Sequence, residues 1–577
     1  MPEYRNPQQE PGMERRLLLV FALTFLAIIL FQPILRKYGS QPPPEEKKPQ
    51  TTLANPPVHP LLPPPPEATT GSAAVSRQGS SEAETVIEND LYKITFTNRG
   101  AQVKSWILKK YTDDQDKPLE LVNLAASAKY GQPLSLFTYD EPLRAKLNSV
   151  LYEPSLTGVA RAPQEISFEY ADPDLAVSKK FHFEHNYLVV VETLVREKGA
   201  AVPALPMWPA GLGDETSPSS YAASLIDYQY NDRVQRLALK KISSGETIRG
   251  PFNWGGVTDQ YFAAIFMPRE PESAGMVTLR NSIDIAKGKR QNPEDTFKAE
   301  VLGAAVGNLQ GPTSLRLYVG PKSLPVLETV NVPSIQNDHP DLRALVDFGW
   351  FGILARPLFV WLRWMEGFVH NWGWAIILQT VIITMALLPL RISSMKSMLK
   401  MQKVAPQIKS IQEKYKKYSM RDPRKQEMQQ EISALYKQEG VNPVGGCLPM
   451  IIQMPFLIAY YRMLGVAIDL RHAHWLWIHD LSAPDAWKLL PIGIIITMFL
   501  TQRMTPQAGM DPAQQKMMNL MMPIMLGVIS WNLAAGLNLY WSVSQLLGIV
   551  QQVMMNRSSL GREMREMMEK RARKAKR

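Results

Sequence analysis

Hydrophobic residues along this chain of 577 residues follow two different periods, and the change of period divides the chain. Up to about residue 325, stretches such as LYKITFTNRG and KKFHFEHNYLVVVETLV alternate apolar and polar residues, with Gly, Pro and Asn/Asp between them. This alternation, rich in β-branched residues, predicts strands. From residue 341 onward, apolar residues recur at helical spacing instead. We therefore predict an all-β domain over 82–325, followed by an α-helical part.

Long uncharged runs predict membrane-spanning helices, because about 20 apolar residues cross a bilayer. The run 17–35 follows Arg15 and Arg16, and no small-residue cleavage pattern comes after it, which favours an uncleaved anchor over a signal peptide. The sequence WNLAAGLN predicts a tight turn between the last two runs. The fold class is thus a polytopic helical membrane protein with an added β domain. Six spans are predicted, at 17–35, 371–390, 445–470, 488–503, 517–535 and 537–555.

The segments outside the spans differ from one another in amino-acid composition. Eleven of the 46 prolines fall between residues 40 and 80, which predicts an extended linker over 36–81. Residues 341–370 mix aromatic residues with arginines at helical spacing, which is typical of an amphipathic helix in the membrane interface. The other connecting segments are an N-terminus (1–16), a hairpin (391–440), two loops (471–487 and 504–516) and a tail (556–577).

The net charge of +11 is concentrated in two places. Residues 391–440 carry +7 and residues 556–577 carry +6, so the remainder is slightly negative. Basic segments of this kind contact nucleic acid or the ribosome, or mark the cytoplasmic side of a membrane protein, and both can be true together. The order of the six spans places both segments on the inside. We therefore expect both termini in the cytoplasm, and the β domain outside the inner membrane.

The basic segment 391–440 has the pattern of two helices. Apolar residues recur at three and four positions from Ile408 and again from Met428. Asp422 and Pro423 fit the start of the second helix, and Gly440 fits its end. A charged hairpin is usually only a solvated one, so ribosome or lipid contact is a hypothesis. The candidate contact residues are Lys409, Lys414, Lys416, Lys417, Arg421, Arg424, Lys425, Arg571, Arg573 and Lys574.

Polar residues within the spans predict a hydrophilic groove. At a rise of about 1.5 Å per residue, four spans place Gln, Thr or Ser at one level in the cytoplasmic half. A Ser or Thr often bonds only its own helix backbone, whereas a glutamine facing lipid is costly and needs a partner or a wet cavity. The candidate groove residues are Gln379, Thr380, Thr384, Gln453, Arg462, Thr497, Thr501, Asn532, Tyr540, Trp541, Ser544 and Gln545.

Two other functions are alternatives to a groove that accepts segments of other proteins. A small-solute transporter or channel could use the same polar residues, but no Asp or Glu lies within the core of any predicted span. An anchored carbohydrate-binding module leaves the other five spans unexplained. The motif HFEH and the three histidines near Asp480 lack a zinc framework, so no metal site is expected. The single Cys447 excludes an intramolecular disulfide.

Specific motifs resemble the YidC membrane protein insertases of Gram-negative bacteria, within the Oxa/Alb family. They include WGGVTDQYFAAIFMP, NWGWAIILQT, ALYKQEGVNPVGGCLPMIIQMPF, WIHDLSAPD and DPAQQKMMNLMMPIM. The resemblance implies a five-helix insertase core with a hydrophilic groove, and a periplasmic β-supersandwich of galactose-mutarotase-like fold. It also implies nascent membrane proteins, ribosomes, the Sec translocon and phospholipids as partners. Enzymatic activity, a cofactor and DNA binding are not expected.

The chain departs from this family at one groove position. The family commonly has an arginine in the first core span, and the alignment of NWG and PL puts Thr384 there. We therefore expect a groove that is uncharged at this level. The hypothesis is that Arg391 and Arg503 supply positive charge at its mouth.

Overall fold

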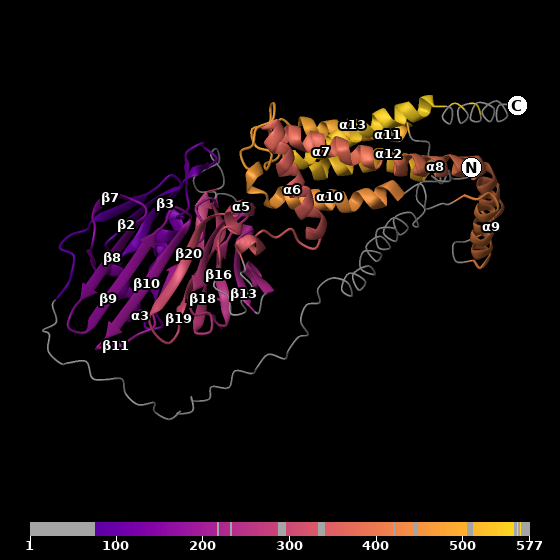
Figure 1. Cartoon of the computed structure of the whole chain (residues 1–577). Coiled ribbons are helices and arrows are strands. Elements are labelled where there is room, and N and C mark those ends of the chain that lie inside the picture. Colours follow the sequence, from indigo (N-terminus) through magenta and orange to yellow (C-terminus); the bar gives the residue numbers. More distant parts are fainter. Residues whose placement is uncertain are drawn as a thin grey trace, which may run out of the picture. The chain divides into compact units, whose positions relative to one another are not determined.

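The computed structural model describes residues 76–215, 218–230, 233–286, 296–332, 341–418, 422–441, 448–504 and 512–558, together with residues 562 and 566. The predicted anchor 17–35 lies outside the described residues, as do most of the proline-rich linker and most of the C-terminal tail. In the described part, the strands of the first region give way to the helices of the second (Figure 1).

The predicted all-β domain is confirmed. Its strands form a ten-stranded sheet and two five-stranded sheets. The strands are β1 (Glu84–Glu88), β2 (Tyr92–Thr97), β3 (Gln102–Thr112), β4 (Pro118–Glu120), β5 (Ser135–Phe137), β6 (Glu153–Pro154), β7 (Gly158–Arg161), β8 (Gln164–Ala171), β9 (Leu175–Phe183), β10 (Leu188–Glu197), β11 (Ala200–Ala201), β12 (Leu205–Trp208), β13 (Leu225–Tyr230), β14 (Arg233–Ala238), β15 (Thr247–Arg249), β16 (Phe252–Thr258), β17 (Phe262–Pro268), β18 (Ala274–Ala286), β19 (Thr296–Asn308) and β20 (Thr313–Pro321).

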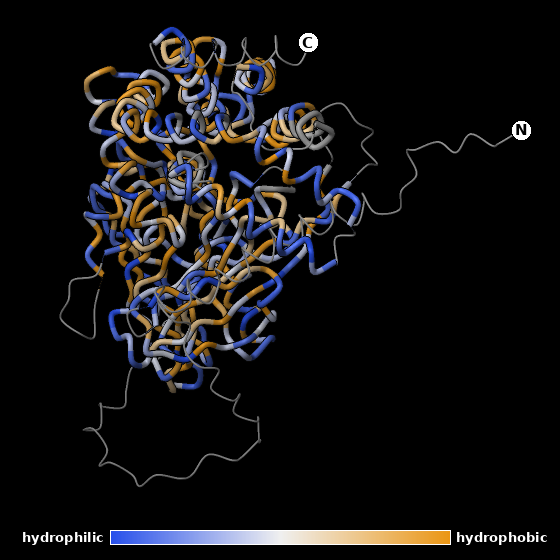
Figure 2. The backbone as a smooth tube through the Cα atoms, turned by 90° about the vertical axis from the view of Figure 1, so that its right-hand side faces the viewer, coloured by the Kyte–Doolittle hydropathy of each residue, from blue (hydrophilic) through white to orange (hydrophobic). Residues whose placement is uncertain are grey.

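Alternation along the strands explains how this domain buries its core. In β9, every second residue from Leu175 to Phe183 is buried. Along the backbone as a whole, hydrophilic and hydrophobic residues alternate at short intervals (Figure 2). Because successive side chains point to opposite faces of a sheet, one face of β9 packs inward. Large aromatic residues fill the interior, and Trp106, Trp208 and Trp254 are completely buried. Short helices interrupt the strands: α2 (Leu124–Tyr130), α3 (Glu141–Ser149), α4 (Pro218–Ala222), α5 (Leu324–Glu328) and the 3₁₀ turn η1 (Leu239–Lys241).

The helical region follows the β domain. Helices α7, α10, α11, α12 and α13 form a bundle in which α13 packs against α7, α10 and α11 (Figure 1). Its elements are η2 (Leu342–Leu345), α6 (Gly352–Val369), α7 (Trp372–Ala386), α8 (Leu388–Lys414), α9 (Arg424–Gln438), α10 (Leu448–Val466), η4 (Ile468–Leu470), α11 (Leu489–Met504), α12 (Pro512–Ser530) and α13 (Ala535–Arg557).

Length and composition of the described helices give limited support for spans. Among the residues that the structure describes, no single helix combines the length and the hydropathy needed to cross a bilayer. Helices α7 and α8 pass the test together as a pair bent by 49°. The number of spans therefore stays a prediction.

The bend between α7 and α8 has a chemical cause. Pro389, in the first turn of α8, has no backbone N–H to donate to the carbonyl of Met385, and its ring crowds that carbonyl. The predicted span runs to residue 390, but α7 ends at Ala386 and α8 begins at Leu388. Arg391 therefore lies in the first turn of a new helix, which changes the direction of its side chain.

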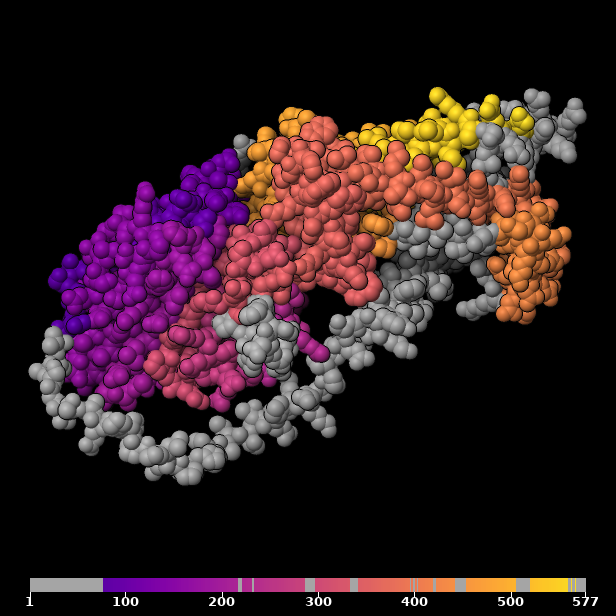
Figure 3. Space-filling view, viewed as in Figure 1, coloured from indigo at the N-terminus to yellow at the C-terminus, as the bar shows by residue number. Residues whose placement is uncertain are grey.

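The predicted helical hairpin is present as α8 and α9. Val404 and Ile408 of α8 and Ile432 of α9 are buried together, as the spacing indicates. Helix α9 begins at Arg424, one residue later than predicted, and the Asp422 carboxylate accepts a hydrogen bond from the Arg424 N–H. In the space-filling view α9, in orange, forms a projecting lobe (Figure 3).

Candidate groove in the helical bundle

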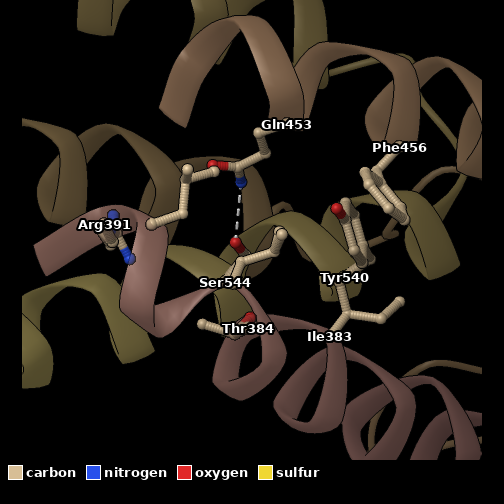
Figure 4. Close-up of a pocket in the computed structure, with 9 residues that line it drawn as sticks. Ile383, Thr384, Arg391, Gln453, Phe456, Tyr540 and Ser544 are labelled. Carbon is tan, nitrogen blue, oxygen red and sulfur yellow. Dashed lines mark hydrogen bonds between the residues drawn. The ribbon is translucent and has the colours of Figure 1, made fainter. Parts of the chain in front are cut away.

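A small cavity lies inside the helical bundle and mixes polar with apolar side chains. Its volume is about 30 Å³, enough for a water molecule. The walls come from α7, the first turn of α8, α10 and α13, and the polar atoms converge on the space between these helices (Figure 4). The lining residues are Ile383, Thr384, Leu387, Leu390, Arg391, Gln453, Phe456, Tyr540 and Ser544.

Two polar side chains meet across the cavity. The Gln453 amide of α10 donates a hydrogen bond of 3.0 Å from Nε2 to the Ser544 Oγ of α13 (Figure 4). Ser544 is buried and Gln453 is half-buried, so both groups are largely withdrawn from the surface of the bundle. The predicted polar level therefore brings together Thr384, Gln453 and Ser544, with Tyr540 beside them.

Arg391 lines the same cavity and brings its only formal charge. Its Nη1 donates a hydrogen bond of 2.6 Å to the Gln551 Oε1 of α13. The guanidinium lies so close to Gly548 that an added Cβ there would stand 2.8 Å from Nη2, so the end of the arginine side chain would have to shift. Thr384 and Arg391 lie on opposite sides of the break between α7 and α8, and both line the cavity. A cation thus lies near the polar level, although Thr384 itself is uncharged.

The predicted residues Gln379 and Thr380 are fully buried and do not line the cavity. The Gln379 Nε2 donates to the Leu358 carbonyl of α6 at 3.0 Å, and the Tyr460 hydroxyl of α10 donates to the Gln379 Oε1. The Thr380 hydroxyl bonds the carbonyl of Ile376 in its own helix. These polar groups are satisfied within the protein.

The other predicted groove residues lie elsewhere. Thr497 and Thr501 donate to carbonyls of their own helix, at Gly493 and Thr497. Arg462 is exposed and lies beside Gly349, in the segment before α6. Residues at other places on the bundle are Asn532, exposed in the turn before α13, Trp541 and Gln545, half-buried on α13, and Arg503, exposed in the last turn of α11.

Sequence reasoning missed several residues of the groove. The apolar wall formed by Ile383, Leu387, Leu390 and Phe456 carries no polar signal. The spacing of Gly548 and Gln551 was a usable signal. Ser544, Gly548 and Gln551 follow one another at four and then three residues, which places all three on one face of α13.

Several candidate contact residues of the hairpin have partners within it. Lys414 forms an ion pair of 2.7 Å with Glu431, and Arg424 pairs with Asp422 at 3.3 Å. Lys409 and Lys416 are exposed. Lys417 lies 5.3 Å from the ring centroid of Tyr418, and Lys425 is half-buried. Candidates outside the described residues are Arg421, Arg571, Arg573 and Lys574.

The histidines near Asp480 have structural partners. The His472 Nδ1 shares a hydrogen bond of 2.8 Å with the Thr112 hydroxyl, and the rings of His474 and His479 meet edge to face. Within the described ranges, no group of three His, Cys, Asp or Glu side chains is placed to hold a metal ion.

Two family models match this chain in succession. The model of the YidC periplasmic domain matches residues 84–361, and that of the 60Kd inner membrane protein matches residues 364–562. Curated relatives named membrane protein insertase YidC include one from Bordetella avium, 31% identical over 497 residues, covering 82% of this chain and 83% of the relative. Another, from Syntrophus aciditrophicus, is 32% identical over 511 residues, covering 85% and 88%.

Solved structures with some likeness include two insertases and an enzyme homologue. An active YidC insertase with its first transmembrane domain resolved is 18% identical, covers 84% of this chain and 95% of its own, and has a TM-score of 0.35. YidC from Thermotoga maritima is 13% identical, with coverages of 82% and 98% and a TM-score of 0.28. A putative aldose 1-epimerase from Escherichia coli K12 is 12% identical, with coverages of 42% and 100% and a TM-score of 0.27.

Proposed function

This chain belongs to the YidC family of membrane protein insertases, and we propose that it inserts membrane proteins through the cavity lined by Arg391, Gln453 and Ser544. The observation that carries the proposal is this group of hydrogen-bonding side chains around a cavity inside the helical bundle. The substrates are nascent proteins of the inner membrane, inserted by this chain alone or together with the Sec translocon. A role as a small-solute transporter is not favoured, because the curated relatives are named insertases.

The energetics of insertion need no covalent chemistry. An apolar substrate helix gains about 25 cal/mol for each Å² of apolar surface removed from water. The barrier is the passage of its polar flanks through hydrocarbon, where unpaired polar groups are costly. In the proposed mechanism, Gln453 and Ser544 exchange their mutual hydrogen bond for bonds to such a flank. Leu387, Leu390 and Phe456, which also line the cavity, contact its apolar part.

Arg391 gives the path a preference for acidic or carbonyl-rich flanks. A guanidinium binds carboxylates through two parallel hydrogen bonds, and such bonds are stronger when they are withdrawn from water. Gln551 holds the group at the cavity but, as a neutral amide, does not neutralise its charge. A substrate carboxylate is therefore attracted to this point of the bundle.

Photo-crosslinking from Gln453 tests the proposed path. With a photoreactive amino acid at position 453 and ribosomes stalled on a short membrane protein, crosslinks should appear once the apolar segment emerges. Met454 is the matched control, because it is the next residue of α10, is 46% exposed and does not line the cavity. Equal crosslinking from both positions, or crosslinks from Met454 alone, would mean that substrates pass along the outside of the bundle.

Gly548 offers a test that leaves the charge in place. In Gly548→Ala, the new Cβ would displace the Arg391 guanidinium from its position at Gln551, since the two atoms cannot stand 2.8 Å apart. Insertion into proteoliposomes should fall about fivefold, the effect of one lost hydrogen bond. Gly493→Ala in α11 is the control, because an added Cβ there meets no atom within 4 Å. The same insertion rate in both variants would contradict a defined position for Arg391.

We further propose that α6 lies in the interface on the periplasmic side of the inner membrane and contacts phospholipids. Its buried face holds Leu358 and Leu362, whereas Ile353, Val360 and Trp364 on the other face are 90%, 58% and 60% exposed. Such an apolar face beside charged residues is typical of an interfacial helix. This placement fits an inner-membrane protein with cytoplasmic termini and a periplasmic β domain.

The hairpin is proposed to contact ribosomes through its exposed cations. Lys409 and Lys416 project from α8 and the turn after it, so charge reversal there should weaken cosedimentation with ribosomes at low salt. The effect should shrink as the salt concentration rises. A variant with Glu at both positions that binds ribosomes as tightly as the parent chain would exclude these two residues from the contact.

A further inference from the structure

A buried polar bridge joins the interfacial helix α6 to the wall of the groove. The Gln379 side chain is 0% exposed and stands between three helices. Its amide N–H donates to the Leu358 carbonyl of α6, and its oxygen accepts from the Tyr460 hydroxyl of α10. One side chain of α7 thus bonds both neighbouring helices, and a carbonyl oxygen with two lone pairs can accept this bond in addition to its helical one.

The bridge continues to the cavity through an aromatic pair. The Tyr460 ring stacks on Tyr540 of α13, with centroids 4.1 Å apart and planes at 15°. Tyr540 is itself a lining residue of the cavity (Figure 4). Contacts therefore run without a break from the α6 backbone, through Gln379 and Tyr460, to the wall of the groove.

We propose that Gln379 is a positioning residue that fixes α6 relative to the groove, so that a displacement of α6 is transmitted to Tyr540. Apolar packing lets helices slide by small amounts at low cost, whereas a hydrogen bond fixes both the distance and the rotation of its partners. Leucine would fill the same space by packing alone, whereas a buried amide is tolerated only while its hydrogen bonds are made. The polar pair Gln379 and Tyr460 specifies one position of α6.

The consequence concerns the coupling of the two parts of the chain. Helix α6 is the first long helix after the β domain in sequence, and Ile353, Val360 and Trp364 on its outer face are exposed. A change in the β domain or in the membrane interface that moves α6 would shift the Leu358 carbonyl. Gln379 and Tyr460 would carry that shift to the cavity. This consequence rests on the proposed insertion path, whereas the tie itself can be measured without substrate.

Distances between spin labels in the full-length chain test whether the hydrogen bonds of Gln379 fix the position of α6. After Cys447→Ser, which removes the single native cysteine, labels go at Trp364→Cys on α6 and Val550→Cys on α13, both more than half exposed. A second pair, Ile382→Cys on α7 with Val550→Cys, reports on the bundle without α6.

The informative variant is Gln379→Met combined with Tyr460→Phe. It keeps the volumes and the ring stack but removes both hydrogen bonds, and it leaves no unpaired hydroxyl behind. We expect the α6 to α13 distance distribution to broaden, the α7 to α13 distribution to stay unchanged, and insertion to fall about fivefold or more for each bond lost.

Gln379→Met alone covers the case in which the double variant does not fold, because Tyr460 keeps its ring stack on Tyr540. It removes the bond to the Leu358 carbonyl and should also broaden the α6 distribution. An α6 distribution that matches the parent in the folded variants would overturn the proposal, even if insertion were lost. Broadening with an unchanged insertion rate would retain the tie but overturn its transmission to the groove. An inactive parent chain with the expected distances would instead count against the proposed function.

Discussion

Replacing Arg391 by glutamine should lower insertion of a test protein with an acidic flank by about 10- to 100-fold. This range corresponds to a lost charged hydrogen bond of about 1.5–3 kcal/mol in the step that admits the flank. Arg391 is the one charged residue among the nine that line the cavity. The measurement is protease protection of the inserted protein, with purified chain in liposomes. A test protein with an uncharged flank should be affected much less.

Two further variants distinguish the effect of a charge inside the cavity from that of a charge at its mouth. Arg503→Gln removes an exposed cation in the last turn of α11 and should leave insertion near the parent level. Thr384→Arg in the Arg391→Gln background places a cation on the same wall and should restore part of the activity. If Arg503→Gln were the damaging change and Arg391→Gln were harmless, the charge that matters would lie at the mouth.

Depth along a helix could be predicted from the sequence, and the predicted level contains both Gln453 and Ser544, which the structure places in contact. Ser544 lies on a part of α13 that runs without a break to Arg557, and Gln453 lies on the stretch of α10 that begins at Leu448. The rise of about 1.5 Å per residue then suffices. It does not suffice for Arg391, because the bend of 49° separates α7 from α8. The proline that causes this bend was visible in the sequence, but its angle depends on the neighbouring helices.

Rotation about the helix axis could not be predicted in the same way. Gln379 and Thr384 belong to one helix, yet the first is sealed between α6 and α10 and the second lines the cavity. Which face of α7 meets α6 depends on packing between distant segments. The bonds of Thr497 and Thr501 to their own helix show that a hydroxyl at the right depth need not face the groove.

The β domain shows the same division between local and long-range information. Alternation identifies strands such as β9, because burial on one face imposes a period of two. The order of the strands is not local: β1 pairs in parallel with β7, and β10 lies between β9 and β20. The pairs β1 with β7 and β10 with β20 join residues as distant in sequence as Thr85 and Gly158 or Thr193 and Thr313, and only the complete core selects them.

Lys179 of β9 illustrates a feature that alternation cannot explain, since it is a lysine with 0% exposure at a core position. Its Nζ donates three hydrogen bonds, to the carbonyls of Gly100, Ala101 and Leu134 at 3.0, 2.6 and 2.7 Å. All three acceptors have positive φ, so they belong to turns whose carbonyls point into the interior. The ammonium therefore donates hydrogen bonds to carbonyl oxygens that the hydrogen-bond pattern between strands does not reach.

Lys179→Met should therefore destabilise the β domain by about 3 kcal/mol, because it leaves three buried carbonyls without a donor at about 1–3 kcal/mol each, offset by the avoided burial of a charge. Hydrogen exchange of β8, β9 and β10 in the full-length chain measures the effect, and the exposed neighbour Lys180→Met is the control. Exchange in β9 as slow as in the parent would show that these carbonyls find other donors.

The pH dependence of the same strands gives a second test of Lys179. Burial lowers the pKa of Lys179 to about 7, below the value of about 10.4 for an unfolded lysine. Between these two pKa values the unfolded chain binds more protons than the folded one, so this residue makes the free energy of unfolding increase with pH. After correction for the intrinsic exchange rate, the protection of β9 should rise from pH 7 to pH 9 in the parent and in Lys180→Met. Lys179→Met should lack that rise, because methionine has no proton to release.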